Sequence, residues 1–261
     1  MRANYHSHTV RCGHARGTER EYIESALAAG MEELGFSDHA PFRLPGLYPG
    51  IRMAPEELGE YVSVLRSLRR EYAGRIQIHI GLEAEYYPAG FPGLLDDARR
   101  EGVEYLILGQ HFPGNEAGEV YFADAFDEPR RLDRYVGQCI EAMQSGVFSY
   151  FAHPDLAHFT GDGALYREAA RRLCRCANDC SLPLEINLLG LRLGRNYPDE
   201  RFWRVAGEEG CAAVLGCDAH DPEGLRVPEA ERAAMAMAER CSLRVLDRVS
   251  LRPLVAEGGG L

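Results

Sequence analysis

The sequence predicts an α/β fold built on a mostly parallel sheet, and three observations support this prediction. The chain has 261 residues, an ordinary length for a single α/β barrel. Short apolar runs alternate with amphipathic stretches, as in repeated β-α units. Residues that can ligate metals stand at or just after the ends of nearly all these runs, and parallel barrels place their active sites at that rim. We expect one domain over 1–261, with a flexible tail at 255–261.

Seven short apolar runs have the length and composition of β-strands. In chain order the predicted strands are Ala3–His6, Glu33–Ser37, Ile76–Leu82, Tyr105–Leu108, Phe148–Ala152, Leu184–Ile186 and Ala213–Gly216. Because each is followed by an amphipathic stretch, the sequence favours crossover connections between parallel neighbours.

The stretches between the strands have helical periodicity. The predicted helices are Glu19–Ala29, Pro55–Tyr72, Pro92–Arg100, Pro129–Ser145, Leu165–Cys180, Asp199–Glu208 and Pro228–Arg240. Four of them begin with a proline, which suits the first helical turn because the missing N–H has no helical partner there. Gly30 and Gly146 follow two of the helices and are typical of helix ends.

The composition bounds the class of protein. Hydrophobic residues make up 46% of the chain and charged residues 26%, which is enough apolar material for one large core. The formal net charge of −11 disfavours nucleic acid as a partner. All 29 basic residues are arginines, because the chain contains no lysine. This excludes a Schiff-base lysine and the phosphate-binding lysine of P-loop enzymes.

The chain has no run of 18 apolar residues and no signal-peptide core at its N-terminus. We therefore expect no membrane span and a cytoplasmic location. The eight cysteines are expected to be mostly reduced thiols in that compartment.

Metal-ligating residues mark the strand ends. In chain order they are His6 and His8, His39, Glu83, His111, His153, and then Asp218 and His220. His6 and His8 face the same side of an extended strand, so both can point into one site. His14 follows in the loop before the first predicted helix, and Glu185 and Asn187 end the sixth strand.

The number of these ligands predicts more than one ion. Seven histidines and two carboxylates exceed the four ligands that zinc usually takes, so a two- or three-metal site is the natural use. Glu83 is the preferred bridge between cations because a carboxylate has two oxygens, and Glu85 is its rival at matching strand parity. The mixed nitrogen and oxygen set suits zinc, manganese or iron better than calcium or magnesium.

Two histidines remain outside this set. His79 lies inside the third predicted strand and is expected to be a packed barrel residue. His158 follows the fifth-strand motif and is a candidate substrate contact, with a solvated loop position as the alternative.

Several segments together resemble one known family. They are YHSHTVRCGHARGTEREY, GFSDHAP, GLEAEYYP, LGQH, AHPDL, LEINLLGLR and GCDAHDP, and they span residues 5–222 in the family's order. On these segments the chain resembles the PHP (polymerase and histidinol phosphatase) family, within it the histidinol-phosphatase branch.

The resemblance implies a distorted (β/α)7 barrel with a metal centre of three divalent transition-metal ions at the C-terminal rim. One ion would be held by His6, His8, Glu83 and Asp218. A second would be held by Glu83, His111 and His153. The third would be held by His14, His39 and His220. All nine positions are filled in this chain, unlike PHP domains that keep the fold and lose the metals.

Phosphate and substrate contacts are less well marked. Arg192 and Arg195 are the best candidates for binding phosphate, because a guanidinium matches phosphate bidentately. The family often has a basic residue after its HPDL motif, where this chain has Ala157 and His158. The acidic or amide candidates for gripping a substrate amine or imidazole are Glu116, Glu119, Asp155 and Asn187.

The predicted function is a metal-dependent phosphomonoesterase that converts L-histidinol phosphate to L-histidinol and phosphate in histidine biosynthesis. A hydroxide bridging two metals would attack phosphorus. Asp218 or His220 could move protons, although a metal ligand is a compromised base. One alternative keeps the site but changes the substrate to a sugar phosphate, a nucleotide or, less favoured, a phosphotyrosine. A second alternative is a nonenzymatic PHP module that supports a partner protein.

Overall fold

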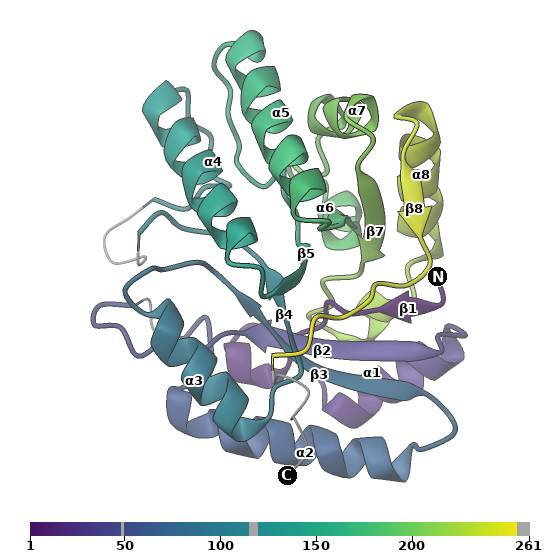
Figure 1. The fold of residues 1–261 in the computed structure, drawn as a ribbon. Coiled ribbons are helices and arrows are strands. Elements are labelled where there is room, and N and C mark those ends of the chain that lie inside the picture. The colour runs from purple at the N-terminus through teal and green to yellow at the C-terminus, as the bar shows by residue number, and fades with distance from the viewer. Residues whose placement is uncertain (48–49, 115–119, 255–261) are drawn as a thin grey trace.

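The computed structural model describes residues 1–47, 50–114 and 120–254. Its centre is one curled sheet of eight parallel strands that follow one another in chain order (Figure 1). The strands are β1 (Ala3–Asn4), β2 (Glu33–His39), β3 (Gln77–Ala84), β4 (Tyr105–Leu108), β5 (Phe148–Phe151), β6 (Leu184–Asn187), β7 (Ala212–Gly216) and β8 (Arg244–Leu246). This arrangement confirms the predicted distorted α/β barrel and adds one strand to it.

Helices cover the outside of the sheet (Figure 1). The α-helices are α1 (Glu19–Ala28), α2 (Leu58–Glu71), α3 (Phe91–Glu101), α4 (Pro129–Gln144), α5 (Gly163–Asp179), α6 (Leu188–Leu193), α7 (Glu200–Glu208) and α8 (Pro228–Arg240). Short 3-10 turns occur at η1 (Val10–Cys12), η2 (Pro55–Glu57) and η3 (Pro222–Leu225). Side-chain caps fix several helix starts; Thr18 and Glu21, for example, form a reciprocal capping box on α1.

The two ends of the predicted seven-stranded set meet at the C-terminal rim. The segment after β1 stays extended, and Ser7 forms a parallel bridge with Ala219 beyond β7. The His8 N–H donates to the Ala219 carbonyl at 2.9 Å, and the Ser37 N–H donates to the Ser7 carbonyl at 2.8 Å. At the opposite end, β8 pairs with the start of β7. The rim is therefore joined where the metal-ligating residues leave the strands.

The interior of the barrel is apolar near its floor. A buried cluster there contains Ala3, Tyr5, Tyr105, Ile107, Tyr150, Ala152, Val214 and Val249. Tyr105 crosses from β4 and donates through its hydroxyl to the Tyr5 carbonyl at 2.8 Å. Gly35 and Gly81 leave room for this ring, because a Cβ at either position would overlap Tyr105. The larger apolar core lies between the strands and the outer helices.

Most predicted elements are present, and the differences have local causes. The first regular strand ends at Asn4 rather than His6, although the Ser37 N–H still donates to the Ser7 carbonyl while Ser7 also bridges to Ala219. The helix α6 and the strand β8 were not predicted; both are short and lack a long periodic pattern. The tail at 255–261 lies outside the described residues. None of the described helices is long and apolar enough to cross a membrane.

A substitution at Gly81 tests the packing of the barrel floor. Gly81→Ala places a methyl group against the Tyr105 ring, and overpacking of this kind costs about 1–3 kcal/mol of unfolding free energy. Gly137→Ala in α4 is the matched control, because a Cβ there meets nothing within 4 Å. The control should gain about 0.5–1 kcal/mol as a helix-interior glycine is removed. Urea unfolding measures the unfolding free energy of both variants. Equal values for Gly81→Ala and Gly137→Ala would contradict the close packing of Tyr105 against Gly81.

Candidate metal centre

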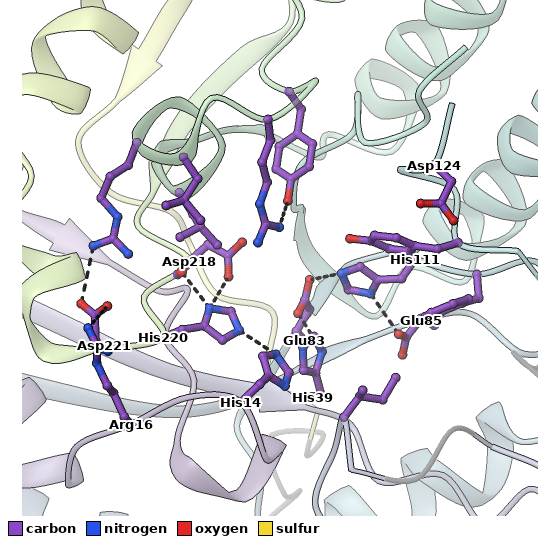
Figure 2. A pocket seen from close by; sticks show the side chains of 18 of the residues that line it. His14, Arg16, His39, Glu83, Glu85, His111, Asp124, Asp218, His220 and Asp221 are labelled. Carbon is purple, nitrogen blue, oxygen red and sulfur yellow. Dashed lines mark hydrogen bonds and ion pairs between the residues drawn. The ribbon is translucent and has the colours of Figure 1, made fainter. Parts of the chain in front are cut away.

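The nine predicted ligand side chains lie together at the C-terminal rim of the barrel. A cavity of about 730 Å³ opens above them and is lined by both arginines that were predicted to bind phosphate. Figure 2 shows Glu83 beside His39, with His14 and His220 on one side and His111 on the other. Five of the nine ligands are buried, namely His6, His8, Glu83, His153 and Asp218.

Strand register explains why these residues meet. His39 is the last residue of β2, and Glu83 is next to the last residue of β3. The two are direct partners in the register of these strands. His111 and His153 follow β4 and β5, which are neighbours in the sheet. Asp218 and the residues after it follow β7, which is bridged to the segment after β1. Parallel strands thus deliver ligands that are distant in sequence to one edge.

Two of the candidate ligands have left-handed backbone conformations. His153 has φ of 34° and Asp218 has φ of 47°. Such values are uncommon for residues with a Cβ and occur often at functional sites. Here they turn each side chain inward immediately after a strand, so the conformation serves the position of the ligand.

Two glycines make room for buried carboxylates. A Cβ at Gly109 would overlap the Glu83 carboxylate, and a Cβ at Gly216 would overlap the Glu185 carboxylate. Gly109 follows β4 and Gly216 ends β7, and each of these strands lies beside the acidic residue's own strand. Glycine is therefore needed at both positions, because a larger residue would occupy the space of a buried carboxylate.

The first group of ligands surrounds one point. His6 Nε2 and His8 Nε2 each lie 3.5 Å from Glu83 Oε2. The same two nitrogens lie 3.5 and 3.2 Å from Asp218 Oδ1. Ligand atoms of a tetrahedral zinc site with bonds of about 2.0 Å are separated by roughly 3.3 Å. The spacing of these four atoms fits such a site.

Unpartnered atoms support the same fit. Among the described residues, His6 Nε2, His8 Nε2 and Glu83 Oε2 are buried and have no hydrogen-bond partner. A buried polar atom without a partner costs about 1–3 kcal/mol. Three such atoms that face one another, with lone pairs available on each, suit a cation.

A second group uses the other oxygen of Glu83. His153 Nε2 lies 2.8 Å from Glu83 Oε1, and His111 Nε2 lies 3.6 Å from the same oxygen. The rings of His111 and His153 are 5.0 Å apart. Glu83 therefore presents one oxygen to each of two groups of imidazoles.

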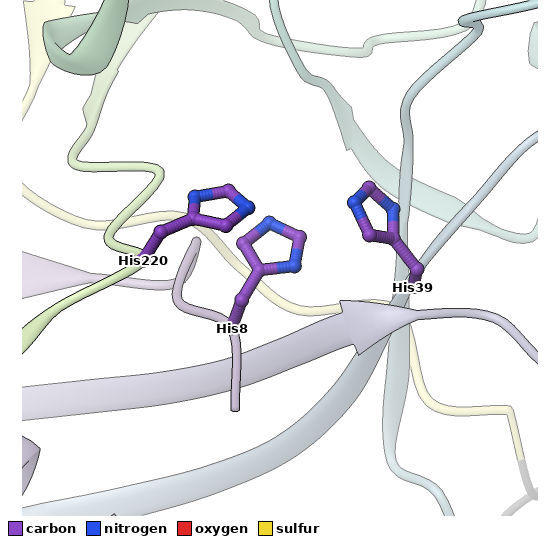
Figure 3. A group of neighbouring side chains, drawn as sticks. All are labelled: His8, His39 and His220. Carbon is purple, nitrogen blue, oxygen red and sulfur yellow. The ribbon is translucent and has the colours of Figure 1, made fainter. Parts of the chain in front are cut away.

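A third group lies toward the mouth of the cavity. His14 Nε2 and His220 Nε2 are 3.0 Å apart, and His39 Nδ1 lies 3.1 Å from Glu83 Oε2. His8, His39 and His220 also bring ligand atoms within 4.8 Å of one another (Figure 3). The ring of His8 stacks on His220 at 4.1 Å, so His8 lies at the boundary of the first and third groups.

The pKa shifts of these groups differ in direction. Against the effect of burial, the neighbouring carboxylates raise the pKa of His6 and of His111 and raise that of His8 to about 9, so these imidazoles would lose a proton when an ion binds.

Burial would raise the pKa of Glu83, but His111, His6 and His39 hold it well below its usual value. Burial would likewise raise the pKa of Asp218, and His6 and His8 lower it well below the usual range. Burial and the neighbouring His8 lower the pKa of His220 to about 3. At neutral pH the two carboxylates are anionic and His220 is neutral, as metal ligands must be.

The nitrogens that face away from the centre have fixed partners. His6 Nδ1 lies 2.9 Å from Glu185, and His111 Nδ1 lies 3.0 Å from Glu85. His14 Nδ1 lies 2.8 Å from the Cys12 carbonyl. These contacts favour the tautomer with hydrogen on Nδ1 and a free lone pair on Nε2. Glu85 thus lies behind a ligand, whereas Glu83 lies among the ligands.

The predicted phosphate contacts lie on the cavity wall. Arg192 Nη1 is 3.5 Å from Asp221 Oδ1, and Arg195 donates to the Tyr197 hydroxyl at 2.6 Å. Arg16 also lines the cavity and lies 3.4 Å from Asp221 (Figure 2). Sequence reasoning missed Arg16, because a lone arginine in a loop has no distinguishing pattern.

Other candidates lie away from the cavity. His158 and Asn187 are not among the residues that line it. Asn187 is buried beneath Asp218, and Asp155 is buried against the Trp203 indole N–H at 2.9 Å. Glu116 and Glu119 lie outside the described residues. His79 packs against Tyr5 near the barrel floor, as expected of a structural residue.

The wall of the cavity includes side chains to which sequence reasoning assigned no role. Tyr121 packs beside His111 at 6.2 Å, and Tyr197 packs beside His153 at 5.7 Å. Burial raises the pKa of both phenols, so they keep their protons at neutral pH. Asp124 adds an acidic group to the lining, away from Arg16 in the view of Figure 2. These three side chains stand outside the ligand motifs in the sequence, so the motifs gave no sign of their place in the cavity.

Comparison with known proteins shows a family and several relatives that this chain resembles in sequence. The family model described as the PHP domain matches residues 4–188. A probable histidinol-phosphatase of Deinococcus radiodurans is 32% identical over 234 residues, covering 83% of this chain and 85% of the relative. A probable histidinol-phosphatase of Schizosaccharomyces pombe is 26% identical and covers 85% of this chain and 81% of the relative.

A solved structure has the same fold. The crystal structure of histidinol phosphate phosphatase from Lactococcus lactis, complexed with zinc, L-histidinol and phosphate, superposes with a TM-score of 0.75. The match covers 95% of this chain and 97% of that chain at 21% sequence identity. This likeness supports the barrel architecture over nearly the whole length of both chains.

Two glutamate variants distinguish a bridging carboxylate from a supporting one. Glu83→Gln should remove bound metal from two positions together, because an amide is a poor bridge between cations. Glu85→Gln should be milder, because Glu85 contacts the outer nitrogen of His111 and the Arg52 guanidinium rather than a group of facing ligand atoms. Elemental analysis after reconstitution and dialysis measures both. Loss of metal in Glu85→Gln but not in Glu83→Gln would contradict this assignment.

Proposed function

The chain belongs to the PHP domain family, and on that premise we propose that it hydrolyses L-histidinol phosphate to L-histidinol and phosphate. The proposal rests on the composition of the cavity. Its lining combines metal-ligating side chains with Arg16, Arg192 and Arg195 and with the acidic Asp124. A small phosphate ester that also bears a positive charge fits such a lining.

We propose three divalent ions at this centre, held by the residues named above. Zinc, manganese or iron suits the donor set of imidazoles and carboxylates. The carbonyl-poor, nitrogen-rich character of the cluster disfavours calcium and magnesium. Bound ions would supply Lewis-acid charge to the phosphate and make water a stronger acid.

The chain's own residues would bind and orient the substrate. Arg192 lies in the last turn of α6 and Arg195 follows that helix, and both would hold phosphate oxygens above the ligand cluster. Asp221 orients both Arg192 and Arg16 by ion pairing. Asp124 is the acidic group that would face the substrate amine, in place of Asp155 and Asn187, which are buried away from the cavity.

Hydrolysis of a phosphate ester also requires groups that move protons. Asp218 and His220 remain the candidates, and their contact at 3.4 Å would let one orient the other. Because Asp218 also lies within 3.5 Å of His6 and His8, its main task in this geometry is ligation. A place in histidine biosynthesis and a cytoplasmic location stay predictions.

Phosphate release from a substrate panel tests this function. L-Histidinol phosphate should exceed a generic aryl phosphate by about two orders of magnitude or more in kcat/KM, because remote contacts position phosphorus for attack. The panel also includes a sugar phosphate and a nucleotide, with metal-free protein as the control. A better sugar phosphate or nucleotide would keep a phosphatase and remove the histidinol assignment. No release from any ester would favour a nonenzymatic module.

The arginines on the wall give a separate prediction. Arg192→Ala should lower kcat/KM about 30- to 1,000-fold, since a charged bidentate contact is worth about 2–4 kcal/mol in the transition state. Metal content should not change, because Arg192 contacts Asp221 and no ligand. Arg195→Ala is the parallel variant. Unchanged kinetics in both would place the phosphate contacts elsewhere in the cavity.

A substitution at Asp124 tests whether this lining residue faces the substrate amine. Asp124→Asn should raise KM for L-histidinol phosphate about two- to fivefold, as expected for an exposed charge pair worth about 0.5–1 kcal/mol. Phenyl phosphate has no amine and serves as the control substrate. An equal change for both esters would show that Asp124 does not face the amine.

A further inference from the structure

The sixth strand ends in two polar side chains that face the barrel interior and are not used in the proposed reaction. Glu185 and Asn187 are two residues apart on β6, so they point to the same side. Both are fully buried, at 0% exposure. A buried carboxylate is costly unless it is paired, so its partners define its role.

Glu185 is bound to the outer face of one candidate ligand. Its Oε2 and Oε1 lie 2.9 and 3.1 Å from His6 Nδ1. With Nδ1 carrying the hydrogen, the Nε2 lone pair of His6 faces Glu83 and Asp218. The absence of a side chain at Gly216, on the neighbouring strand, gives the carboxylate its space.

Asn187 connects this carboxylate to a second candidate ligand. Its Nδ2 donates to Glu185 Oε1 at 2.8 Å and to Asp218 Oδ2 at 3.1 Å. The Asn187 oxygen accepts from the Gly190 N–H at 2.9 Å at the start of α6. Because a backbone N–H can only donate, this bond fixes which end of the amide faces the carboxylates.

The result is a continuous chain of contacts from His6 through Glu185 and Asn187 to Asp218. With Oδ2 held by the amide, Asp218 presents Oδ1 to His6 and His8. We propose that Glu185 and Asn187 are positioning residues that form a buried brace between His6 and Asp218, fixing both for the same metal ion. This inference rests on the proposed metal-dependent function and assigns Asn187 a role other than substrate binding.

Two variants interrupt the brace while keeping side-chain size. Glu185→Gln removes the charge behind His6 and places a second donor against the Asn187 amide. Asn187→Asp keeps an oxygen for the Gly190 N–H, and therefore the helix cap, but replaces a donor by a carboxylate facing two others. Both should weaken zinc binding at one site about 10- to 100-fold, as is typical when a partner of a ligand is lost.

Glu33→Gln is the matched control. Glu33 accepts from the Tyr5 hydroxyl at 2.9 Å and lies 3.0 Å from His79 Nε2, at the far end of the same barrel. Glu33→Gln therefore alters a similar carboxylate–imidazole contact that involves none of the candidate ligands. The zinc affinity of this variant should equal that of the wild type.

The experiment measures zinc affinity by competition with a chelating dye, and ligand geometry from the visible absorption of cobalt(II)-substituted protein. Thermal unfolding of the metal-free variants shows which are folded, and Asn187→Asp carries the test if Glu185→Gln does not fold. Weaker binding and altered cobalt bands in the brace variants, with an unchanged control, support the inference. Unchanged affinity and bands in a folded brace variant, or equal loss in the control, overturn it. A wild type that binds no metal overturns the proposed function as well.

Discussion

The Glu83 carboxylate, buried among imidazoles, is the interaction on which the rest of the site depends. Removing a carboxylate from water is unfavourable, and here the neighbouring histidines more than offset the effect of burial on its pKa. Its two oxygens face different groups: Oε2 faces His6 and His8, while Oε1 faces His153. A neutral or shorter side chain at this position would leave both groups without a common anion.

This constraint shapes the barrel around it. The floor is filled by large aromatic rings such as Tyr105, and the candidate ligands lie above them at the rim. Gly109 and Gly216 remove side chains where Glu83 and Glu185 need space. The bridge between Ser7 and Ala219 joins the first and last ligand-bearing segments. Apolar packing below and glycine at the strand ends therefore allow a dense set of ionisable groups to stay buried in a folded protein.

The sequence predicted the strands well, and it predicted that the candidate ligands gather at one rim, because both follow local rules; their binding of metal stays a prediction. Strand ends are marked by apolar runs, and ligands such as His111 and His153 stand directly after them. How deeply a side chain lies below the rim could not be predicted. Strand parity places Asn187 inside the barrel but does not show that it lies beneath Asp218. Asp155 was misplaced for the same reason, since its partner Trp203 is distant in sequence. Short elements such as β8 and side chains from separate loops, such as Asp124, leave no periodic signal.

We propose that one shared carboxylate organises a multi-metal centre at the rim. Anomalous diffraction from crystals of the zinc-reconstituted protein tests this proposal, because it locates ions independently of activity. We expect three peaks within the nine-residue cluster, two of them adjacent to opposite oxygens of Glu83. Absence of a peak beside Glu83, or zinc bound only at other places on the protein, would contradict it.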